Sequence, residues 1–325
     1  MSHTVLKIKT HVSWNFVSAM ALALLLMVCG GYSPLEAAVK SVQQKTYSSP
    51  EDAVRALVDA VRSDDIKQMS IVLGPNGKDI VSSGDKIADK DISERFIRLY
   101  NEKNRIEMIG DSRAILSVGE KDWPLPIPIV KKGQQWLFDS KGAKEEILNR
   151  RIGRNELAVI KVCEAYVDAQ QEFALMDSNG NGLFEYAQKF RSTPGKKDGL
   201  YWKTKPGEKE SPFGGFAVRA TREGYKATSS KPIPYHGYFY KILTGQGKNA
   251  SGGAYDYIVR GRMIGGFAMV AYPAAYGVSG IMTFTVNHDG IVYEKNLGKN
   301  TESIAQATKL FNPDKTWKRS EMKRE

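Results

Sequence analysis

Apolar positions at helical spacing dominate the chain between residues 49 and 101. A helix start is predicted at Ser49–Asp52, where an N-cap serine, a proline at the first helical position and acidic residues follow one another. Four apolar residues then recur on one helical face: Val54, Leu57, Val58 and Val61. A second short helix is predicted from Asp64 toward Leu73, and a third over about residues 92–101.

Short segments typical of strands replace the helical pattern after residue 104. Four strands are predicted, at residues 105–109, 114–118, 127–130 and 135–139. Between them, Trp123–Pro128 carries prolines at alternate positions, which suits an edge strand whose missing N–H groups face water; a proline-type peptide ligand is the alternative. Helices followed by antiparallel strands predict an N-terminal α+β domain over residues 39–142.

A long helical pattern opens the second half of the chain. It runs from Ala143 to Met176, with Gly153 as a weak point. Residues 192–234 are rich in Gly, Pro, Lys and Ser, which favours long loops over another packed element. Five strands are then predicted, at residues 238–244, 255–260, 267–272, 281–287 and 291–296. A hairpin turn is predicted at Asp289–Gly290, between the last two strands, and a closing helix at about residues 301–310. Residues 143–325 are therefore expected to form a long helix packed on an antiparallel sheet.

Residues 1–38 have the pattern of a secretory signal. Lys7 and Lys9 make a cationic start, and the apolar run Phe16–Cys29 is shorter than the about 20 residues that a transmembrane helix needs. A signal cleaved after Ala37 is predicted, which places the mature protein in the periplasm or outside the cell. The alternative is a lipoprotein signal, in which Cys29 is acylated and anchors the chain.

Composition narrows the class of protein. The 325 residues are 42% hydrophobic and 26% charged, as in ordinary globular proteins, and the two cysteines, Cys29 and Cys163, exclude a disulfide-rich scaffold. Cys163 has apolar neighbours on the predicted helix and is expected to be buried. The formal net charge is +11, but the basic residues occur in small groups such as Lys131-Lys132, with acids between them. This pattern does not indicate nucleic acid; an envelope protein or an anionic envelope surface is the expected partner.

One segment after the long helix resembles the first part of a calcium-binding loop. Its oxygen ligands would be the side chains of Asp177, Asn179, Asn181 and Glu185 and the backbone carbonyl of Leu183. Gly182 stands where such loops turn sharply, but Gln188 replaces the usual bidentate glutamate, so any calcium site is expected to be weak. The alternative is that Asn and Gly simply end the helix after Met176.

A histidine and an aspartate are the remaining candidates for catalysis. His236 could pair with Asp256 as a general base if the adjacent strands pair. The chain lacks a Gly-x-Ser-x-Gly elbow, and His236 follows a proline-tyrosine turn where a structural hydrogen bond is common. The sequence therefore favours a protein without enzymatic activity and keeps the His236/Asp256 pair as the alternative.

Several motifs carry resemblances to known families. The segments Ile152–Ala158, Ala165–Gln170, Tyr235–Tyr238, Gly253–Tyr257 and Gly261–Ala268 resemble an exported bacterial family catalogued as domain of unknown function 2950. The helix from near Asn155, with Gly237–Tyr240, Phe267–Pro273, Thr283–Val286 and Asp289–Ile291, is similar to the globular part of bacterial pseudopilins. The second resemblance implies one long helix packed on a small antiparallel sheet, and neither implies an activity.

The sequence thus predicts an exported α+β protein of the cell envelope. N-terminal helices with a small antiparallel sheet would precede a pseudopilin-like long helix on a second sheet. The expected function is a non-enzymatic binding or structural component with a calcium-stabilised loop. A periplasmic hydrolase that uses His236 and Asp256 is the alternative.

Overall fold

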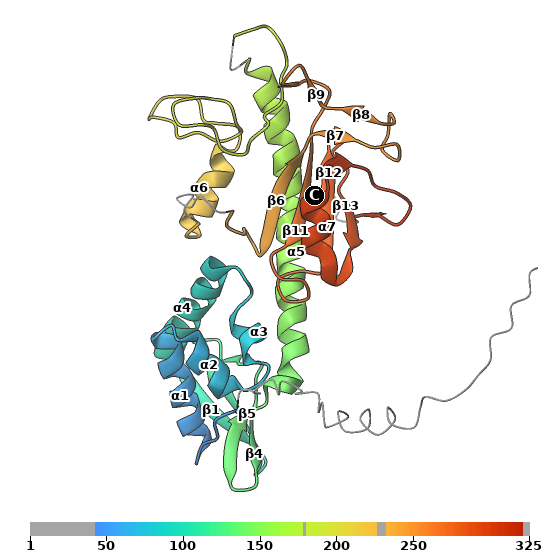
Figure 1. Cartoon of the computed structure of the whole chain (residues 1–325). Coiled ribbons are helices and arrows are strands. Elements are labelled where there is room, and N and C mark those ends of the chain that lie inside the picture. Colours follow the sequence, from blue (N-terminus) through green and yellow to red (C-terminus); the bar gives the residue numbers. More distant parts are fainter. Residues whose placement is uncertain (1–42, 178–179, 226–231, 321–325) are drawn as a thin grey trace, which may run out of the picture. The chain divides into compact units, whose positions relative to one another are not determined.

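The computed structural model describes residues 43–177, 180–225 and 232–320 (Figure 1). The predicted signal, with Cys29 and Ala37, lies outside these residues, and so does Asn179 of the predicted calcium loop. All of these described residues belong to one compact unit, which contains two separate buried apolar clusters. The predicted domain boundary at residue 142 therefore stays a prediction. None of the helices in the described ranges is both long and apolar enough to cross a membrane.

Four helices precede the first sheet: α1 (Pro50–Arg62), α2 (Ile66–Leu73), α3 (Gly77–Val81) and α4 (Lys86–Glu102). The predicted cap of the first helix is confirmed, since the Ser49 hydroxyl accepts a hydrogen bond from the N–H of Asp52 at 3.1 Å. Asp65 caps α2 in the same way, through the N–H of Gln68. Helix α4 begins six residues before the predicted start at residue 92, because Asp85 caps it. Helix α3 was not predicted.

The first sheet is antiparallel, with the strand order β1-β2-β4-β5 and β3 paired to β2. Its strands are β1 (Asn104–Ile109), β2 (Arg113–Val118), β3 (Trp123–Pro124), β4 (Ile129–Lys132) and β5 (Gln135–Phe138). The four predicted strands are confirmed to within two residues at each end, and of the predicted edge segment only Trp123 and Pro124 form a strand. The face toward the helices buries Leu116, Ile129 and Phe138 against Val54 and Leu57 of α1.

Helix α5 (Ser140–Leu175) is the long helix that the apolar pattern predicted. It continues without a break through Gly153, since packing on both halves of the chain offsets the low helix propensity of glycine. Its later turns bury Val159, Cys163 and Tyr166 against the second sheet. Cys163 is fully buried, as predicted, and burial raises the pKa of its thiol far above the ordinary value.

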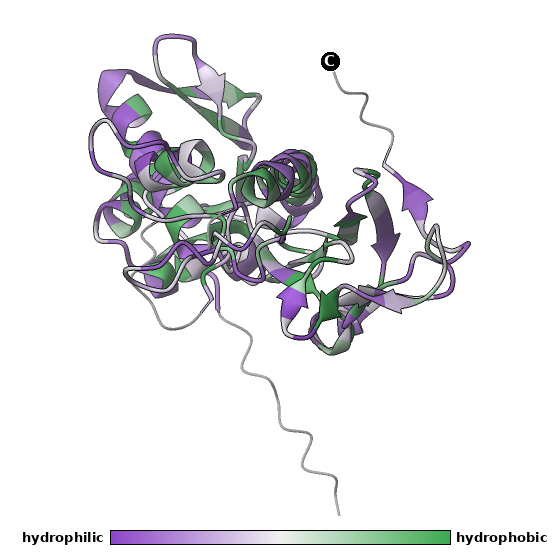
Figure 2. Ribbon diagram, turned by 90° about the horizontal axis from the view of Figure 1, so that it is seen from above, coloured by the Kyte–Doolittle hydropathy of each residue, from purple (hydrophilic) through white to green (hydrophobic). Residues whose placement is uncertain are grey.

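The second sheet is also antiparallel, with the order β15-β13-β12-β11-β6. Its strands are β6 (Tyr238–Leu243), β11 (Ala268–Pro273), β12 (Met282–Asn287), β13 (Tyr293–Asn296) and β15 (Lys318–Arg319). The predicted hairpin between β12 and β13 is confirmed, because the N–H of Gly290 donates to the carbonyl of Asn287 at 2.9 Å. Figure 2, which looks along α5, shows apolar residues in green on this helix and on neighbouring strands. The structure is therefore α+β, as predicted.

Short strands and a closing helix complete the second half. A three-stranded sheet contains β14 (Leu310–Phe311), β7 (Gly245–Gln246) and β8 (Tyr255–Asp256), and a two-stranded sheet contains β9 (Ile258–Val259) and β10 (Arg262–Met263). The predicted strand at 255–260 is thus two short strands, and the closing helix α7 (Thr301–Ala307) follows a 3-10 turn at Gly298–Asn300.

Residues 192–234 hold a helix that the sequence analysis did not predict. Helix α6 (Gly214–Arg222) packs through Phe216, whose ring lies 4.7 Å from Phe213 and 5.3 Å from Tyr235 between centroids. The expectation of loops alone was wrong for this stretch. The Gly, Pro and Lys content of this stretch indicated loops. The helix is stabilised by aromatic contacts of Phe213 and Phe216 with each other and with Tyr235.

Candidate functional site: a pocket at the end of the long helix

A pocket of about 490 Å³ lies where α5 ends and the chain turns back. Helix α5 contributes Phe173 and Ala174, the next loop contributes Asp177, Leu183 and Glu185, and the segment that follows contributes residues 186–189 and 196–198. Three of the five predicted calcium ligands therefore line one pocket. Asp177 has a left-handed backbone (φ +40°), which ends the helix and turns the chain toward the pocket.

The Asp177 carboxylate closes the loop on itself. Its Oδ1 accepts a hydrogen bond from the N–H of Asn181 and its Oδ2 accepts one from the N–H of Gly182, both at 3.0 Å. Gly182 has a φ of +73°, in the region that favours glycine, as the sharp turn of the predicted loop requires. These contacts fit both the predicted calcium loop and its alternative, a simple end of the helix after Met176.

Asn181 and Glu185 face each other across the loop. The Asn181 Nδ2 donates to Glu185 Oε1 at 2.6 Å, while its Oδ1 accepts from the N–H of Leu183 at 2.8 Å. Arg262 of β10 approaches the same Glu185 oxygen at 3.3 Å. Glu185 is therefore shared between the loop and the β9–β10 hairpin.

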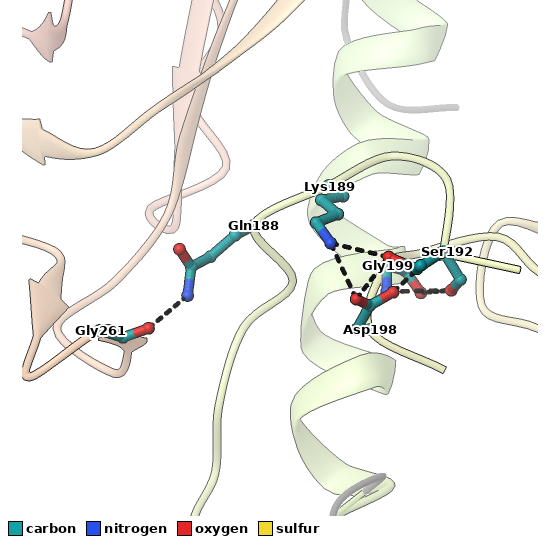
Figure 3. A network of polar contacts seen from close by, with 7 residues as sticks. Gln188, Lys189, Ser192, Asp198, Gly199 and Gly261 are labelled. Carbon is teal, nitrogen blue, oxygen red and sulfur yellow. Dashed lines mark hydrogen bonds and ion pairs between the residues drawn. The ribbon is translucent and has the colours of Figure 1, made fainter. Parts of the chain in front are cut away.

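The donor set of this loop contains two carboxylates. No group of three or more His, Cys, Asp or Glu side chains suited to a metal ion occurs within residues 43–177, 180–225 and 232–320. The Gln188 amide donates to the carbonyl of Gly261 at 2.8 Å, so it ties the segment to the β9–β10 hairpin (Figure 3). Gln188, which stands where calcium loops normally have a bidentate glutamate, is therefore hydrogen-bonded to the protein.

A second polar network holds the pocket wall that follows the loop (Figure 3). Lys189 Nζ contacts Asp198 Oδ2 at 2.8 Å, and Thr193 donates to both oxygens of Asp198, through its N–H at 2.7 Å and its hydroxyl at 2.8 Å. The hydrogen bond from the Lys189 ammonium holds the pKa of the Asp198 carboxyl well below its usual range. Ser192 and Gly199 also bond to each other, through the Gly199 N–H at 3.0 Å.

The sequence analysis missed the contribution of this second segment. Lys196 and Lys197 line the pocket together with Lys189, and Lys197 lies over the ring of Trp202, 5.6 Å from its centroid. The pocket thus combines carboxylate, amide and carbonyl oxygens from one segment with ammonium groups from another. Such a site can bind a cation at the loop and polar or anionic groups at the lysines.

His236 lies in a different part of the structure, beside α6. Its Nε2 is 3.4 Å from Glu223, the residue that caps the C-terminus of α6, and its ring lies 4.1 Å from the ring of Tyr235 between centroids, tilted by 60°. Asp256 pairs with Gly245 in the small three-stranded sheet and is not among the acids that act on His236. The acid beside His236 is Glu223, which could not be predicted because α6 itself was not.

Acid should destabilise the protein partly through His236. Burial lowers the pKa of His236 below its ordinary 6.5, and the Arg154 and Arg219 charges act in the same direction, while Glu223 and Asp85 oppose them. The unfolded chain therefore binds this proton more readily, and the stability that His236 contributes above pH 6.5 is lost as the pH falls through its folded-state pKa.

We expect His236→Asn to lose less free energy of unfolding than the wild type between pH 7 and pH 5. Asparagine also tolerates the left-handed backbone of this position (φ +49°). Urea unfolding at both pH values measures the difference. An equal loss in both proteins would show that His236 does not contribute.

Comparison with known proteins places the chain in a family. A family model described as a protein of unknown function (DUF2950) matches residues 44–320, which include both sheets, α5 and the pocket. Searches of curated proteins and of solved structures gave no significant match, so the similarity to pseudopilins stays a prediction from the sequence. The family resemblance of the sequence motifs is confirmed: the chain belongs to the DUF2950 family of proteins of unknown function.

Proposed function

We propose that this protein is a non-enzymatic binding or structural component of the cell envelope, in which calcium stabilises the loop that lines the pocket at the end of α5. One observation carries the proposal: Asp177, Leu183 and Glu185 line the same 490 Å³ pocket, and the Asp177 carboxylate already closes the loop. Export rests on the charged and apolar pattern of residues 1–38, with cleavage after Ala37 or acylation of Cys29 as its two forms.

The chain's own oxygens would supply part of the calcium shell. Calcium takes six to eight oxygen ligands, and Asp177, Asn181, Glu185 and the carbonyl of Leu183 offer the protein part, with water completing the shell. The bound ion would offset the two carboxylate charges. It would also tie the end of α5 to the segment whose Tyr186 N–H donates to the carbonyl of Met263 at 2.8 Å. With only two carboxylates, we expect a dissociation constant of about 10⁻⁴–10⁻³ M.

Arg262 provides a sharp test, because it competes with calcium for Glu185. Removing its charge in Arg262→Gln should tighten calcium binding about thirtyfold, the effect of one unit charge about 4 Å from a divalent ion in a largely hydrated site. Glu185→Gln should weaken binding. Isothermal titration with calcium measures both, and Lys248→Gln, an exposed charge on another loop, is the matched control. Affinities that are equal in all four proteins would contradict the proposed ligands.

A periplasmic hydrolase is the second candidate function, and it rests on His236. Left-handed backbone conformations such as its φ of +49° concentrate at functional sites, and Glu223 lies 3.4 Å away. In this candidate Glu223, in place of Asp256, would orient the imidazole as a general base. Hydrolysis of a p-nitrophenyl ester that disappears in His236→Asn would support it, and equal rates in both proteins would contradict it.

A further inference from the structure

A second cavity, of about 150 Å³, lies between the four N-terminal helices, the loop that precedes β4 and helix α5. Apart from Asp89, Ser93 and Arg151, its walls are apolar side chains, among them Leu57, Met69, Ile80, Phe96 and Leu125. A cavity of this volume with apolar walls accommodates a group about the size of benzene. The cavity is separate from the pocket at the end of α5, with which it shares no residue.

Helix α4 packs on the core through Ile97, Leu99 and Tyr100, and its earlier turns cover this cavity. None of its 17 residues is fully buried, although an amphipathic helix normally buries its apolar stripe. Ile92 and Phe96 line the cavity from α4, and 44% of Ile92 is exposed. The part of the apolar side of α4 that holds Ile92 and Phe96 thus faces space that a small apolar group can fill.

One of the two charged residues that line the cavity is the buried Arg151. Arg151 is 7% exposed; its Nη1 donates to the carbonyl of Asp79 at 2.7 Å, and its Nη2 donates to the carbonyl of Ile80. None of the ion pairs found among the described residues includes Arg151, and buried cations are normally paired with an anion. A carboxylate could form charge-assisted hydrogen bonds with the remaining N–H groups of the guanidinium.

Asp89 also lines the cavity, and its charge acts on Arg151 without a direct contact. Both Asp89 oxygens accept the N–H of Ser83, at 3.1 and 2.9 Å, so the carboxylate points toward the segment that precedes α4. Burial raises the pKa of Asp89, while the hydrogen bonds from Ser83 and the charge of Arg151 act in the opposite direction.

We propose that this cavity binds a small monocarboxylic acid with one apolar group of about the size of a benzene ring, with the carboxylate at Arg151. The volume and apolar walls of the cavity require a small apolar group. The guanidinium of Arg151, which has no ion pair among the described residues, favours a carboxylate at one end of the ligand. This site lies apart from the calcium loop and does not depend on the function proposed for it.

Three probes that share one ring separate the charge requirement from simple filling of the cavity. They are 4-methylbenzoate, toluene and benzylamine, each titrated into the full chain and followed by ligand-observed NMR. We expect 4-methylbenzoate to bind at least tenfold more tightly than toluene, and benzylamine to bind most weakly. Equal affinities, or tighter binding of benzylamine, would overturn the proposal.

Two phenylalanine substitutions on α4 test the place of binding. Ser93→Phe puts a ring into the cavity and should weaken 4-methylbenzoate binding at least tenfold, whereas Arg95→Phe, at an exposed position of the same helix, should leave it unchanged. In Arg151→Gln the preference for 4-methylbenzoate over toluene should disappear. Wild-type affinity in folded Ser93→Phe would overturn the proposal even if Arg151→Gln does not fold.

Discussion

Asp85→Ala is expected to destabilise the protein by about 3–5 kcal/mol, because one fully buried carboxylate serves four donors. Its Oδ1 accepts the N–H groups of Ile87 and Ala88 at 3.2 and 3.1 Å, which caps α4. Its Oδ2 accepts the hydroxyl of Tyr225 at 2.7 Å and the N–H of Gly237 at 2.9 Å. Alanine would leave these donors without their acceptor and would separate α4 from the segments that hold Tyr225 and Gly237.

Urea unfolding followed by circular dichroism measures the loss. Tyr225→Phe removes one of the four donors and should cost about 1 kcal/mol. Asp91→Ala, at an exposed position of the same helix, is the matched control and should change the free energy of unfolding by less than about 0.5 kcal/mol. If Asp85→Ala lost no more than Asp91→Ala, Asp85 would not have the role that its hydrogen bonds indicate.

Gly280→Ala is expected to cost about 3 kcal/mol, the upper end of what overpacking a core usually costs. A β-carbon at this position would lie well inside contact distance of the Tyr238 ring and hydroxyl. Tyr238 cannot move away easily, since it is fully buried and its hydroxyl donates to the carbonyl of Met282 at 2.9 Å. The substitution should therefore displace β6, which carries Tyr238, from the segment that holds Gly280 or force the ring out of its position.

The same substitution at Gly153 is the control and should have the opposite sign. Gly153 lies inside α5 with open space around its α-carbon, so alanine there should stabilise the protein by about 0.5–1 kcal/mol through helix propensity. Tyr238→Leu should make Gly280→Ala less costly than it is in the wild type, as expected for two residues in contact. Additive losses in that double mutant would contradict a clash between the two residues.

Helices and strands were predicted correctly where residues within or next to the element determine where it begins and ends. Ser49 caps α1 as its sequence context indicates, and the apolar spacing of α5 is long enough to predict its course through Gly153. The start of α4 was placed too late because the local N-cap at Asp85, which accepts the N–H groups of Ile87 and Ala88, was not used; the contacts of Asp85 with Tyr225 and Gly237 could not be predicted. Contacts between residues about 140–150 positions apart leave no local pattern.

The candidate sites also combine local motifs, which the sequence predicts, with contacts between distant residues, which it does not. The oxygen spacing from Asp177 to Glu185 is a local motif, and the structure places its described members around one loop. The lysines of the pocket wall and the contact between Arg262 and Glu185 arise from chain folding and had no signal in the sequence. His236 was identified as a candidate, but its neighbour Glu223 depends on α6, which the Gly-, Pro- and Lys-rich composition of residues 192–234 did not indicate.

Thermal unfolding with and without calcium tests the central claim most directly. At 10 mM calcium, about 10–100 times the expected dissociation constant, binding should stabilise the protein by about 1.4–2.7 kcal/mol and raise Tm by about 2–5 °C. Magnesium at the same ionic strength should have a much smaller effect, because it requires a tighter octahedral shell. Asp177→Asn should reduce the calcium-dependent shift. An unchanged Tm in 10 mM calcium, relative to the same protein in chelator, would contradict a calcium-stabilised loop.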